Sequence, residues 1–254
     1  MKLTLIGNGI MAQSIARGLI KNHEVEIIGR DIDKLKIIQE KIPQITIKVL
    51  EENEDVTNKI LIFCVKPYAL ESVATRLVGS ANILFSILAG TKLENLKKQI
   101  KAKHYIRTMP NVAASVQNSM TTITGDNEVK PIAMEIFSSI GQAIWVNTED
   151  QLDIATAVAG SGPAFLALIA EALADGAVKA GLERHLSYQL VQGLFSGTSS
   201  LLKHSHPATI KDSVMSPGGT TAAGYGKLEE AGVRNAMIKA VEEAYKKALE
   251  LGKK

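Results

Sequence analysis

The spacing of apolar residues changes from strand-like to helix-like along this chain. In its first part, short runs rich in Ile, Val and Leu alternate with segments whose apolar residues recur every three to four positions. The runs occupy residues 3–6, 24–28, 45–49, 60–65, 83–87 and 105–106. This alternation predicts a parallel, doubly wound sheet of the α/β class. Two further β-type runs follow at residues 120–124 and 143–146.

The remainder of the chain has an all-α pattern. From Asp150 onward, Ala, Leu, Glu and Lys dominate at helical spacing. We therefore predict a domain boundary near residue 150, with an α/β domain over residues 1–150 and a helical domain over residues 151–254. A length of 254 residues with 46% apolar content agrees with about two domains.

The first helix of this second part is expected over residues 151–159, with an interruption at 160–163. Pro163 lacks an amide hydrogen and clashes with the preceding turn, so it should end or kink the helix. A second helix is expected over residues 164–180, ending at Gly181.

The start of that second helix, residues 164–170, is apolar on every side, which predicts burial all round. Two modest domains would bury such a helix more readily in a subunit interface than in a monomer core. The final helical run has a single apolar face, formed by Val233, Met237, Val241, Ala244, Ala248 and Leu251.

A glycine motif stands between the first strand and the first helix. The residues Gly7-Asn8-Gly9-Ile10-Met11-Ala12 form the pattern G-x-G-x-x-A. Gly7 would make the tight turn, Gly9 would let a pyrophosphate reach the backbone, and Ala12 is small enough for close helix packing. In this strand-to-helix context the motif predicts a dinucleotide site of the Rossmann type.

The residues after the second strand bear on the choice of nicotinamide cofactor. Asp31 could bind the ribose 2′-hydroxyl of NADH, whereas Arg30 could bind the 2′-phosphate of NADPH. We favour NADPH, because Arg30 stands at the strand tip and no acidic residue does, and NADH stays open. Alternatively, Arg30 and Asp31 form a solvent-exposed turn and do not contact a cofactor.

The carboxyl ends of two further strands should also line the cofactor site. Val65-Lys66-Pro67 follows the fourth β-type run, and residues 86–90 end the next one, where open α/β sheets place their ligands. Lys66 could face the cofactor or the solvent. Residues 86–90 could equally form a simple turn.

A second glycine-rich segment lies at residues 212–221, which read DSVMSPGGTT. Pro217 fixes its own φ, and the glycines let backbone amides approach a ligand closely. A helix that begins near Thr220 would direct unpaired amides at an anion, so the segment can bind a carboxylate. An ordinary loop with a helix N-cap is the alternative.

Composition and charge narrow the function classes. A formal net charge of +3 and an aromatic content of 4% give neither a nucleic-acid face nor a stacking platform. The longest apolar segment is broken by Glu171 and Asp175, so we expect a soluble protein without a membrane span. The N-terminus begins as a strand without a leader-like segment, and the lone cysteine, Cys64, suits a reducing cytoplasm as a core thiol.

The histidines do not predict a metal site. Only His204 and His206 have metal-like spacing, and no carboxylate cluster or cysteine pair accompanies them. Pro207 should instead begin a helix directly after them. We expect no metal.

Five motifs in order make the whole sequence resemble the pyrroline-5-carboxylate reductase family. They are residues 7–18, Val65-Lys66-Pro67, Met109-Pro110-Asn111, Ser161-Gly162-Pro163-Ala164 and residues 212–221. The resemblance implies an NAD(P)H-dependent reduction of 1-pyrroline-5-carboxylate to L-proline, the last step of proline biosynthesis. It also implies a cytoplasmic homo-oligomer, dimeric or a multiple of dimers, whose helical C-terminal domain forms the dimer. The runs at 120–124 and 143–146 would then extend one edge of the sheet.

The resemblance also implies roles for individual residues. The Ser216 hydroxyl and the amides of Gly219 and Thr220 would hold the substrate carboxylate, and the Thr221 hydroxyl would reach the ring nitrogen. Ser216 and Thr221 are thus the candidate catalytic residues, and the substrate-binding set is Ser216, Gly218, Gly219, Thr220 and Thr221. The expected cofactor-binding residues are Ile6, Gly7, Asn8, Gly9, Ile10, Met11, Arg30, Asp31, Cys64, Val65, Lys66, Pro67, Leu88 and Ala89.

Asp212 and Ser213 precede this loop. They either shape it, meet the cofactor from the partner subunit, or simply form the C-terminal turn of a helix.

Two other function classes remain at this point. A hydroxy-acid dehydrogenase of related architecture would need a catalytic lysine on the long helix. Lys179 is the only lysine between Asp150 and Lys203, and it lies far from the break at 160–163. A nucleotide-sensing module would bind NADPH without turnover.

Overall fold

The computed structural model describes residues 1–252, which form two compact units. The first unit is Met1–Pro163 together with the C-terminal segment from Ala244, and the second is Ala164–Glu243. We predicted a domain boundary near residue 150, whereas the contacts of the chain divide it after Pro163. The end of the last helix also belongs to the first unit.

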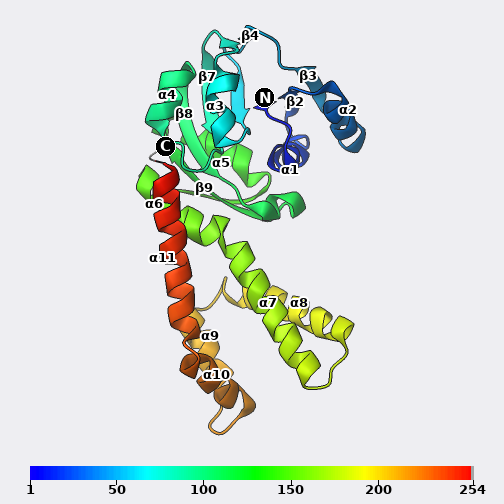
Figure 1. Ribbon diagram of the computed structural model, residues 1–254, viewed down its shortest axis with the longest axis vertical. Coiled ribbons are helices and arrows are strands. Elements are labelled where there is room, and N and C mark those ends of the chain that lie inside the picture. The colour runs from blue at the N-terminus through cyan, green and yellow to red at the C-terminus, as the bar shows by residue number, and fades with distance from the viewer. Residues whose placement is uncertain (253–254) are drawn as a thin grey trace. The chain divides into compact units, whose positions relative to one another are not determined.

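The first unit is built on an eight-stranded sheet in the order β10-β9-β8-β7-β5-β1-β2-β3 (Figure 1). Each β-type run of the sequence corresponds to one of these strands. The strands are β1 (Lys2–Ile6), β2 (Glu24–Gly29), β3 (Thr46–Val49), β5 (Ile60–Phe63), β7 (Ala81–Ser86), β8 (Ala102–Met109), β9 (Ser119–Gly125) and β10 (Gly141–Trp145).

The sheet is parallel except at one pair. β8 and β9 are antiparallel, with Ile106 opposite Gly125, and β9 then pairs in parallel with β10. The connection over residues 110–118 is too short for the crossover that a parallel neighbour needs, so β9 must return in the opposite direction. β9 and β10 extend one edge of the sheet, as expected. A separate two-stranded sheet, β4 (Glu54–Asp55) with β6 (Leu77–Val78), was not predicted.

Two apolar cores cover the two faces of the sheet. Leu84 and Phe85, neighbours in β7, are both fully buried and belong to different clusters, because successive side chains of a strand point to opposite faces. Helices and 3₁₀ turns complete both layers. They are α1 (Ile10–Leu19), α2 (Ile32–Lys41), η1 (Pro67–Ala69), α3 (Leu70–Ala74), α4 (Leu93–Gln99), η2 (Val112–Val116), η3 (Asn127–Val129), α5 (Lys130–Ser138) and α6 (Glu149–Ala155).

One long helical run connects α6 to the second unit. α6 continues through a π-helical turn, η4 (Thr156–Gly160), into α7 (Gly162–Lys179). The expected interruption at Pro163 is therefore a change of helical register rather than a break. The second unit also contains α8 (Arg184–Leu201), α9 (Pro207–Ser213), α10 (Thr220–Glu230) and the start of α11 (Val233–Leu251).

The apolar start of α7 is not buried within the single chain. Leu166 is 50% exposed and Leu168 66%, and Leu190 on α8 is 63% exposed. The expected burial on every side would therefore need a surface from outside this chain.

The run Glu149–Lys179 is long and apolar enough to cross a membrane by length and composition, with 17% of its most apolar window buried. We expected Glu171 and Asp175 to exclude such a segment, and they do not. Length and composition alone do not separate a membrane span from an interface helix. The 17% burial does set it apart from a core helix.

Candidate nucleotide cleft and anion-binding loop

The turn after β1 has the backbone that a dinucleotide fingerprint requires. Gly7 has φ +115, and a Cβ at this position would lie 2.7 Å from the carbonyl oxygen of Cys64. Only glycine satisfies both conditions. Gly9, in contrast, has extended backbone, is the N-cap of α1, and has open space where a Cβ would stand. A ligand can thus approach Gly9 from the side without a side chain.

Helix α1 begins directly after Gly9, beside that open space. The first amides of a helix have no acceptor within the helix, and here the cap residue has no side chain to offer one. Together with the positive end of the helix dipole, they form a site for the pyrophosphate of a dinucleotide. Ala12 is fully buried beneath this turn, as its predicted packing role requires.

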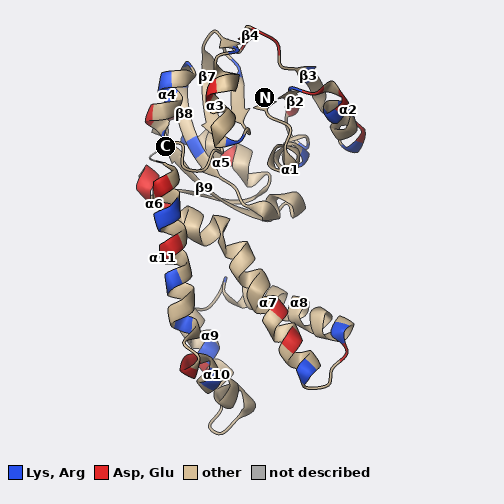
Figure 2. Ribbon diagram, viewed as in Figure 1, with Lys and Arg blue, Asp and Glu red and all other residues tan. Residues whose placement is uncertain are grey.

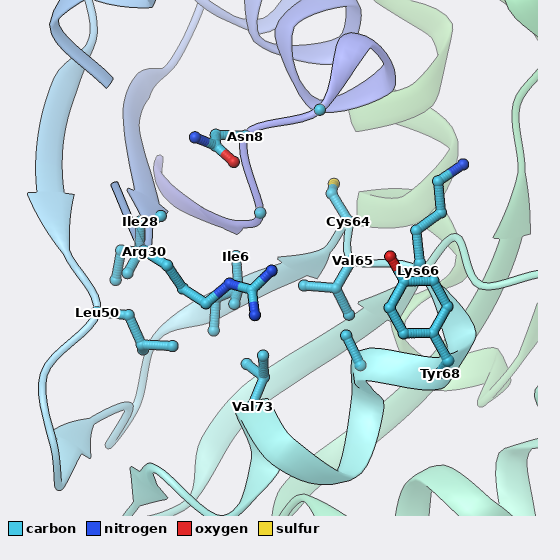
Figure 3. A pocket seen from close by; sticks show the side chains of 14 residues that line it. Ile6, Asn8, Ile28, Arg30, Leu50, Cys64, Val65, Lys66, Tyr68 and Val73 are labelled. Carbon is cyan, nitrogen blue, oxygen red and sulfur yellow. The ribbon is translucent and has the colours of Figure 1, made fainter. Parts of the chain in front are cut away.

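A cleft of about 200 Å³ opens beside the turn (Figure 3). Eight of the residues predicted to bind the cofactor line it, namely Ile6, Gly7, Asn8, Gly9, Arg30, Cys64, Val65 and Lys66. They come from the ends of β1, β2 and β5, neighbours in the sheet. The sequence did not point to Ile28, Gly29, Leu50, Tyr68, Ala69 and Val73, which also line the cleft. Tyr68 is 87% exposed. An aromatic residue directly after Val65-Lys66-Pro67 was the available signal in the sequence.

Arg30 and Asp31 have different surroundings. The Arg30 side chain extends into the cleft, with Asn8 on one side and Val73 on the other (Figure 3). Asp31 is the N-cap of α2, and its Oδ1 accepts hydrogen bonds from the amides of Asp33 at 3.1 Å and Lys34 at 3.2 Å. The hydrogen bond from the Lys34 amide lowers the pKa of the Asp31 carboxyl. The structure therefore gives Asp31 a capping role, while Arg30 faces the cleft.

Besides Asp31, five more of the residues predicted to bind the cofactor do not line this cleft. Ile10 and Met11 are in the first turn of α1, and Ile10 is 83% exposed. Leu88 is 2% exposed within the second apolar core, so its side chain is not available to a ligand. Pro67 and Ala89 line a separate cavity of about 650 Å³ that also contacts Leu251. Any contact of these residues with a cofactor stays a prediction.

Cys64 has the environment of a structural thiol. It packs against the first apolar core at the end of β5. Burial raises the pKa of the Cys64 thiol, which keeps it protonated and unreactive at neutral pH. A role as nucleophile does not fit this position.

The glycine-rich loop of the second unit forms a tight turn ahead of α10. The Gly219 amide donates to the Ser216 carbonyl oxygen at 3.0 Å, with Pro217 and Gly218 at the two central positions. Gly218 has φ +69, as the third residue of a type II turn requires. We expected the Gly219 amide to hold a ligand, but it is already paired within this turn.

Donors for an anion remain at the start of α10. Gly219 is its N-cap and has no side chain, so the amides of Thr220 and Thr221 begin the helix without an intrahelical acceptor. Ser216 Oγ lies beside Gly219, because a Cβ added at Gly219 would be 2.4 Å from this oxygen. Ser216, Thr220 and Thr221 are all exposed. This arrangement of hydroxyls and amides can accept a carboxylate.

Asp212 and Ser213 have partners within their own helix end. Asp212 pairs with the ammonium group of Lys211, and Ser213 Oγ donates to the Ile210 carbonyl oxygen at 2.8 Å. These contacts are those of a helix C-terminal turn, one of the three alternatives for this pair.

A buried charge cluster was not predicted. Arg107, in β8, is 1% exposed, and its Nη1 lies 2.9 Å from Glu149 Oε1 while its Nη2 lies 2.8 Å from Asp153 Oδ1. The Leu93 amide also donates to Glu149 Oε1 at 2.9 Å. The cluster fixes α6 to the sheet. An arginine directly after the run at residues 105–106 was the only signal in the sequence.

The surface carries charges of both signs. Lys, Arg, Asp and Glu are interspersed along α2 and α11 (Figure 2). Within residues 1–252, no three His, Cys, Asp or Glu side chains come together as a metal site. His206 is a helix cap, with Nδ1 accepting from the Ala208 amide at 3.2 Å, and Pro207 begins α9 as predicted.

The fold and the cleft define a class of protein, the dinucleotide-binding proteins with an N-terminal Rossmann sheet and an appended helical unit. Comparisons with known proteins narrow this class. Residues 149–251 match the family model "Pyrroline-5-carboxylate reductase dimerisation", and residues 2–90 match "NADP oxidoreductase coenzyme F420-dependent". The pyrroline-5-carboxylate reductase of Synechocystis is 41% identical, over 100% of this chain and 99% of its own.

Solved structures agree with the sequence comparison. A pyrroline-5-carboxylate reductase from Coxiella burnetii has a TM-score of 0.86 and 29% identity, covering 99% of this chain and 98% of its own. The Plasmodium falciparum pyrroline carboxylate reductase with NADP bound has a TM-score of 0.81 and 26% identity, with the same coverage. The chain belongs to the pyrroline-5-carboxylate reductase family.

Proposed function

We propose that this protein reduces 1-pyrroline-5-carboxylate to L-proline with NADPH as the hydride donor. The observation that carries the proposal is the full-length similarity to pyrroline-5-carboxylate reductases, in a chain that has both an open dinucleotide turn and a glycine-rich anion loop. A hydroxy-acid dehydrogenase would need a lysine on the long helix. Lys179, the last residue of α7, does not supply it near the turn at Thr156–Gly160.

The residues of the cleft fit a dinucleotide. Gly9 leaves room for a pyrophosphate at the N-terminus of α1, and residues 64–66 line the same cleft beside Gly7. When bound, the cofactor supplies the hydride. The protein would bind and orient it through these backbone groups.

The surroundings of Arg30 support NADPH over NADH. A 2′-phosphate carries negative charge, and the Arg30 guanidinium in the cleft is a geometric match for it. A ribose 2′-hydroxyl would instead need a carboxylate acceptor. Asp31 Oδ1 already accepts from the first amides of α2, and Oδ2 pairs with the Lys34 ammonium group at 3.4 Å.

The loop at residues 216–221 is the proposed substrate site. Ser216 Oγ and the amides of Thr220 and Thr221 would hold the substrate carboxylate, with the α10 dipole favouring the anion. Holding the carboxylate fixes the direction of the ring, so that C5 of the imine can be presented to the hydride. The Thr221 hydroxyl would contact the ring nitrogen, which takes up a proton from Thr221 or from water.

The imine needs little further activation. Its C=N bond is already electrophilic, and protonation at nitrogen increases that character. In the balanced reaction one hydride forms a C–H bond at C5, one proton ends on nitrogen, and the C=N double bond becomes single. Alignment is therefore the main contribution of the protein.

Assembly and location complete the proposal. Exposed apolar side chains on α7 and α8, with the match to a dimerisation family, support a homodimer formed through the second unit. We propose that the dimer brings the 216–221 loop of one subunit to the cofactor cleft of the other.

Cytoplasmic location and the absence of nucleic-acid and membrane partners remain proposals, which rest on the lone protonated thiol and the mixed surface charge.

A coupled assay tests this function. Purified protein should oxidise NADPH when pyrroline-5-carboxylate is added, in buffer without added metal. NADH supplied in parallel measures the cofactor preference. Turnover that a chelator abolishes and zinc restores would contradict the proposed metal-free mechanism, and binding of NADPH without any oxidation would indicate a sensing module.

A further inference from the structure

Pro163 leaves a backbone acceptor unpaired in the long helix. In a regular α-helix, the amide of residue 163 would donate to the carbonyl oxygen of Ala159. Proline has no amide hydrogen, so this donor is missing. The Asn111 side chain supplies another, because its Nδ2 donates to the Ala159 carbonyl oxygen at 2.9 Å.

Asn111 is itself held by two further hydrogen bonds. Its backbone amide donates to Ser119 Oγ at 3.1 Å. Its side-chain Oδ1 accepts from the backbone amide of Ala113 at 3.1 Å, as the cap of η2. It follows Met109 at the carboxyl end of β8, on the edge of the sheet where the cofactor-side ends of the parallel strands lie. The Asn111 amide group is thus a rigid donor fixed to the sheet.

The acceptor belongs to the π-helical turn Thr156–Gly160. The Ser161 amide donates to the Thr156 carbonyl oxygen at 3.1 Å, and Thr156 Oγ1 donates to the Leu152 carbonyl oxygen at 2.7 Å. A π turn shifts the register of every residue that follows it, and such turns are frequent at functional sites. The bond from Asn111 therefore joins the sheet to the point where the helix changes register.

We propose that Asn111 is a positioning residue for hydride transfer. Its side chain replaces the donor that Pro163 lacks and fixes the π turn through which the chain leaves the first unit. The loop at residues 216–221 lies beyond that turn in the second unit. The inference rests on the proposed function, since it concerns the presentation of the imine to NADPH.

The Asn111→Ser variant tests the donor. Serine keeps a cap oxygen for η2 but is too short to reach Ala159. We expect kcat with the imine to fall by about tenfold to a hundredfold, as small misplacements of reacting groups do. NADPH binding, measured by fluorescence titration, should stay close to wild type, because the cleft is formed by β1, β2 and β5.

Rescue separates positioning from general damage. Pro163→Ala restores an amide that can donate to the Ala159 carbonyl oxygen, so Asn111→Ser combined with Pro163→Ala should recover most of the lost kcat. Pro163→Ala alone should stay close to wild type, because a carbonyl oxygen accepts two hydrogen bonds. Asn118→Ser is the matched control, since Asn118 Nδ2 donates to the Val116 carbonyl oxygen, at 3.4 Å, within its own turn.

The outcomes distinguish this inference from the proposed function. No NADPH oxidation by the wild-type protein would refute the proposed function before any variant is made. An active wild type with an equally active Asn111→Ser variant would overturn the positioning role. So would an impaired Asn111→Ser variant that Pro163→Ala fails to rescue, or one whose NADPH affinity falls in parallel with kcat.

Discussion

Arg107 Nη2 lies 2.8 Å from Asp153 Oδ1, and both side chains are buried, at 1% and 5% exposure. The same guanidinium contacts Glu149 through Nη1. This ion pair ties β8 to α6, the helix that begins the long run into the second unit. The first unit thus anchors the connection with a charge cluster in addition to apolar contacts.

Removing one partner of this cluster should be strongly destabilising. Asp153→Asn removes the nearer of the two counter-charges of the buried guanidinium, while Glu149 keeps its contact, so the loss should be that of one charge-assisted hydrogen bond, about 1.5–3 kcal/mol. The free energy of unfolding, measured by urea denaturation, reports the loss. Glu94→Gln is the control, because the Glu94–Lys98 pair is exposed to solvent and contributes little to stability. Equal losses in the two variants would contradict a structural role for the Arg107 cluster.

Arg30→Ala should weaken NADPH and leave NADH nearly unchanged. A charge-assisted contact with the 2′-phosphate is worth about 1.5–3 kcal/mol, or roughly tenfold to a hundredfold in affinity. Kd values for both cofactors, from fluorescence titration, test this. Equal losses would mean that Arg30 is structural. A loss of NADH affinity in Asp31→Ala, without loss of helix stability, would instead identify Asp31 as the selector.

Gly7→Ala and Gly9→Ala should fail in different ways. At Gly7 the added Cβ would meet the Cys64 carbonyl oxygen at a φ of +115, so the turn itself should be disrupted and the thermal midpoint lowered. At Gly9 the space is open, so stability should be kept. The methyl group there should obstruct the pyrophosphate and weaken NADPH and NADH alike. Unchanged cofactor affinity in Gly9→Ala would place the dinucleotide elsewhere.

Thr221→Val should lower kcat while NADPH affinity stays intact. The substitution keeps the volume and removes the hydroxyl proposed to contact the ring nitrogen. Mixed with a Gly9→Ala subunit, it should recover activity if sites are shared between subunits, because one site of each heterodimer then receives both intact parts. Self-contained sites would recover none, and a fully active monomer in sedimentation would exclude shared sites.

His23 should make stability depend on pH. Burial lowers the pKa of His23, the N-terminal ammonium group lowers it further, and Glu135 at 3.9 Å opposes both. The unfolded chain then binds more protons than the folded one, so stability should fall as pH drops below the ordinary value of 6.5. His23→Gln should flatten this slope in urea denaturation. His185→Gln, at an exposed position, should keep it, and a slope that survives His23→Gln would assign it to another group.

The features that could be predicted are those determined by neighbouring residues. The strand-to-helix turn at Gly7 and Gly9 depends on a local sequence pattern, and the structure has the backbone that this pattern requires. The turn at Pro217 and Gly218 is likewise local. The eight long strands followed from apolar runs, whereas β4 and β6, with two residues each, are too short to show a period.

The features that could not be predicted depend on pairs far apart in the chain. Arg107 is 46 residues from Asp153, and Asn111 is 48 residues from Ala159. Neither pair leaves a periodic signal. Pro163 was expected to interrupt the helix because its missing amide is a local fact, while the donor that replaces this amide comes from the sheet. The antiparallel direction of β9 differs from these pairs, because it follows from the short connection over residues 110–118, a local feature that was available in the sequence.

Isotope transfer tests the central claim most directly. The protein would be incubated with pyrroline-5-carboxylate and NADPH that carries deuterium at the transferable position of the nicotinamide ring, and the product would be analysed by mass spectrometry. We predict proline with a single deuterium at C5. NADPH consumption without labelled proline, or no reaction with this imine, would contradict the account.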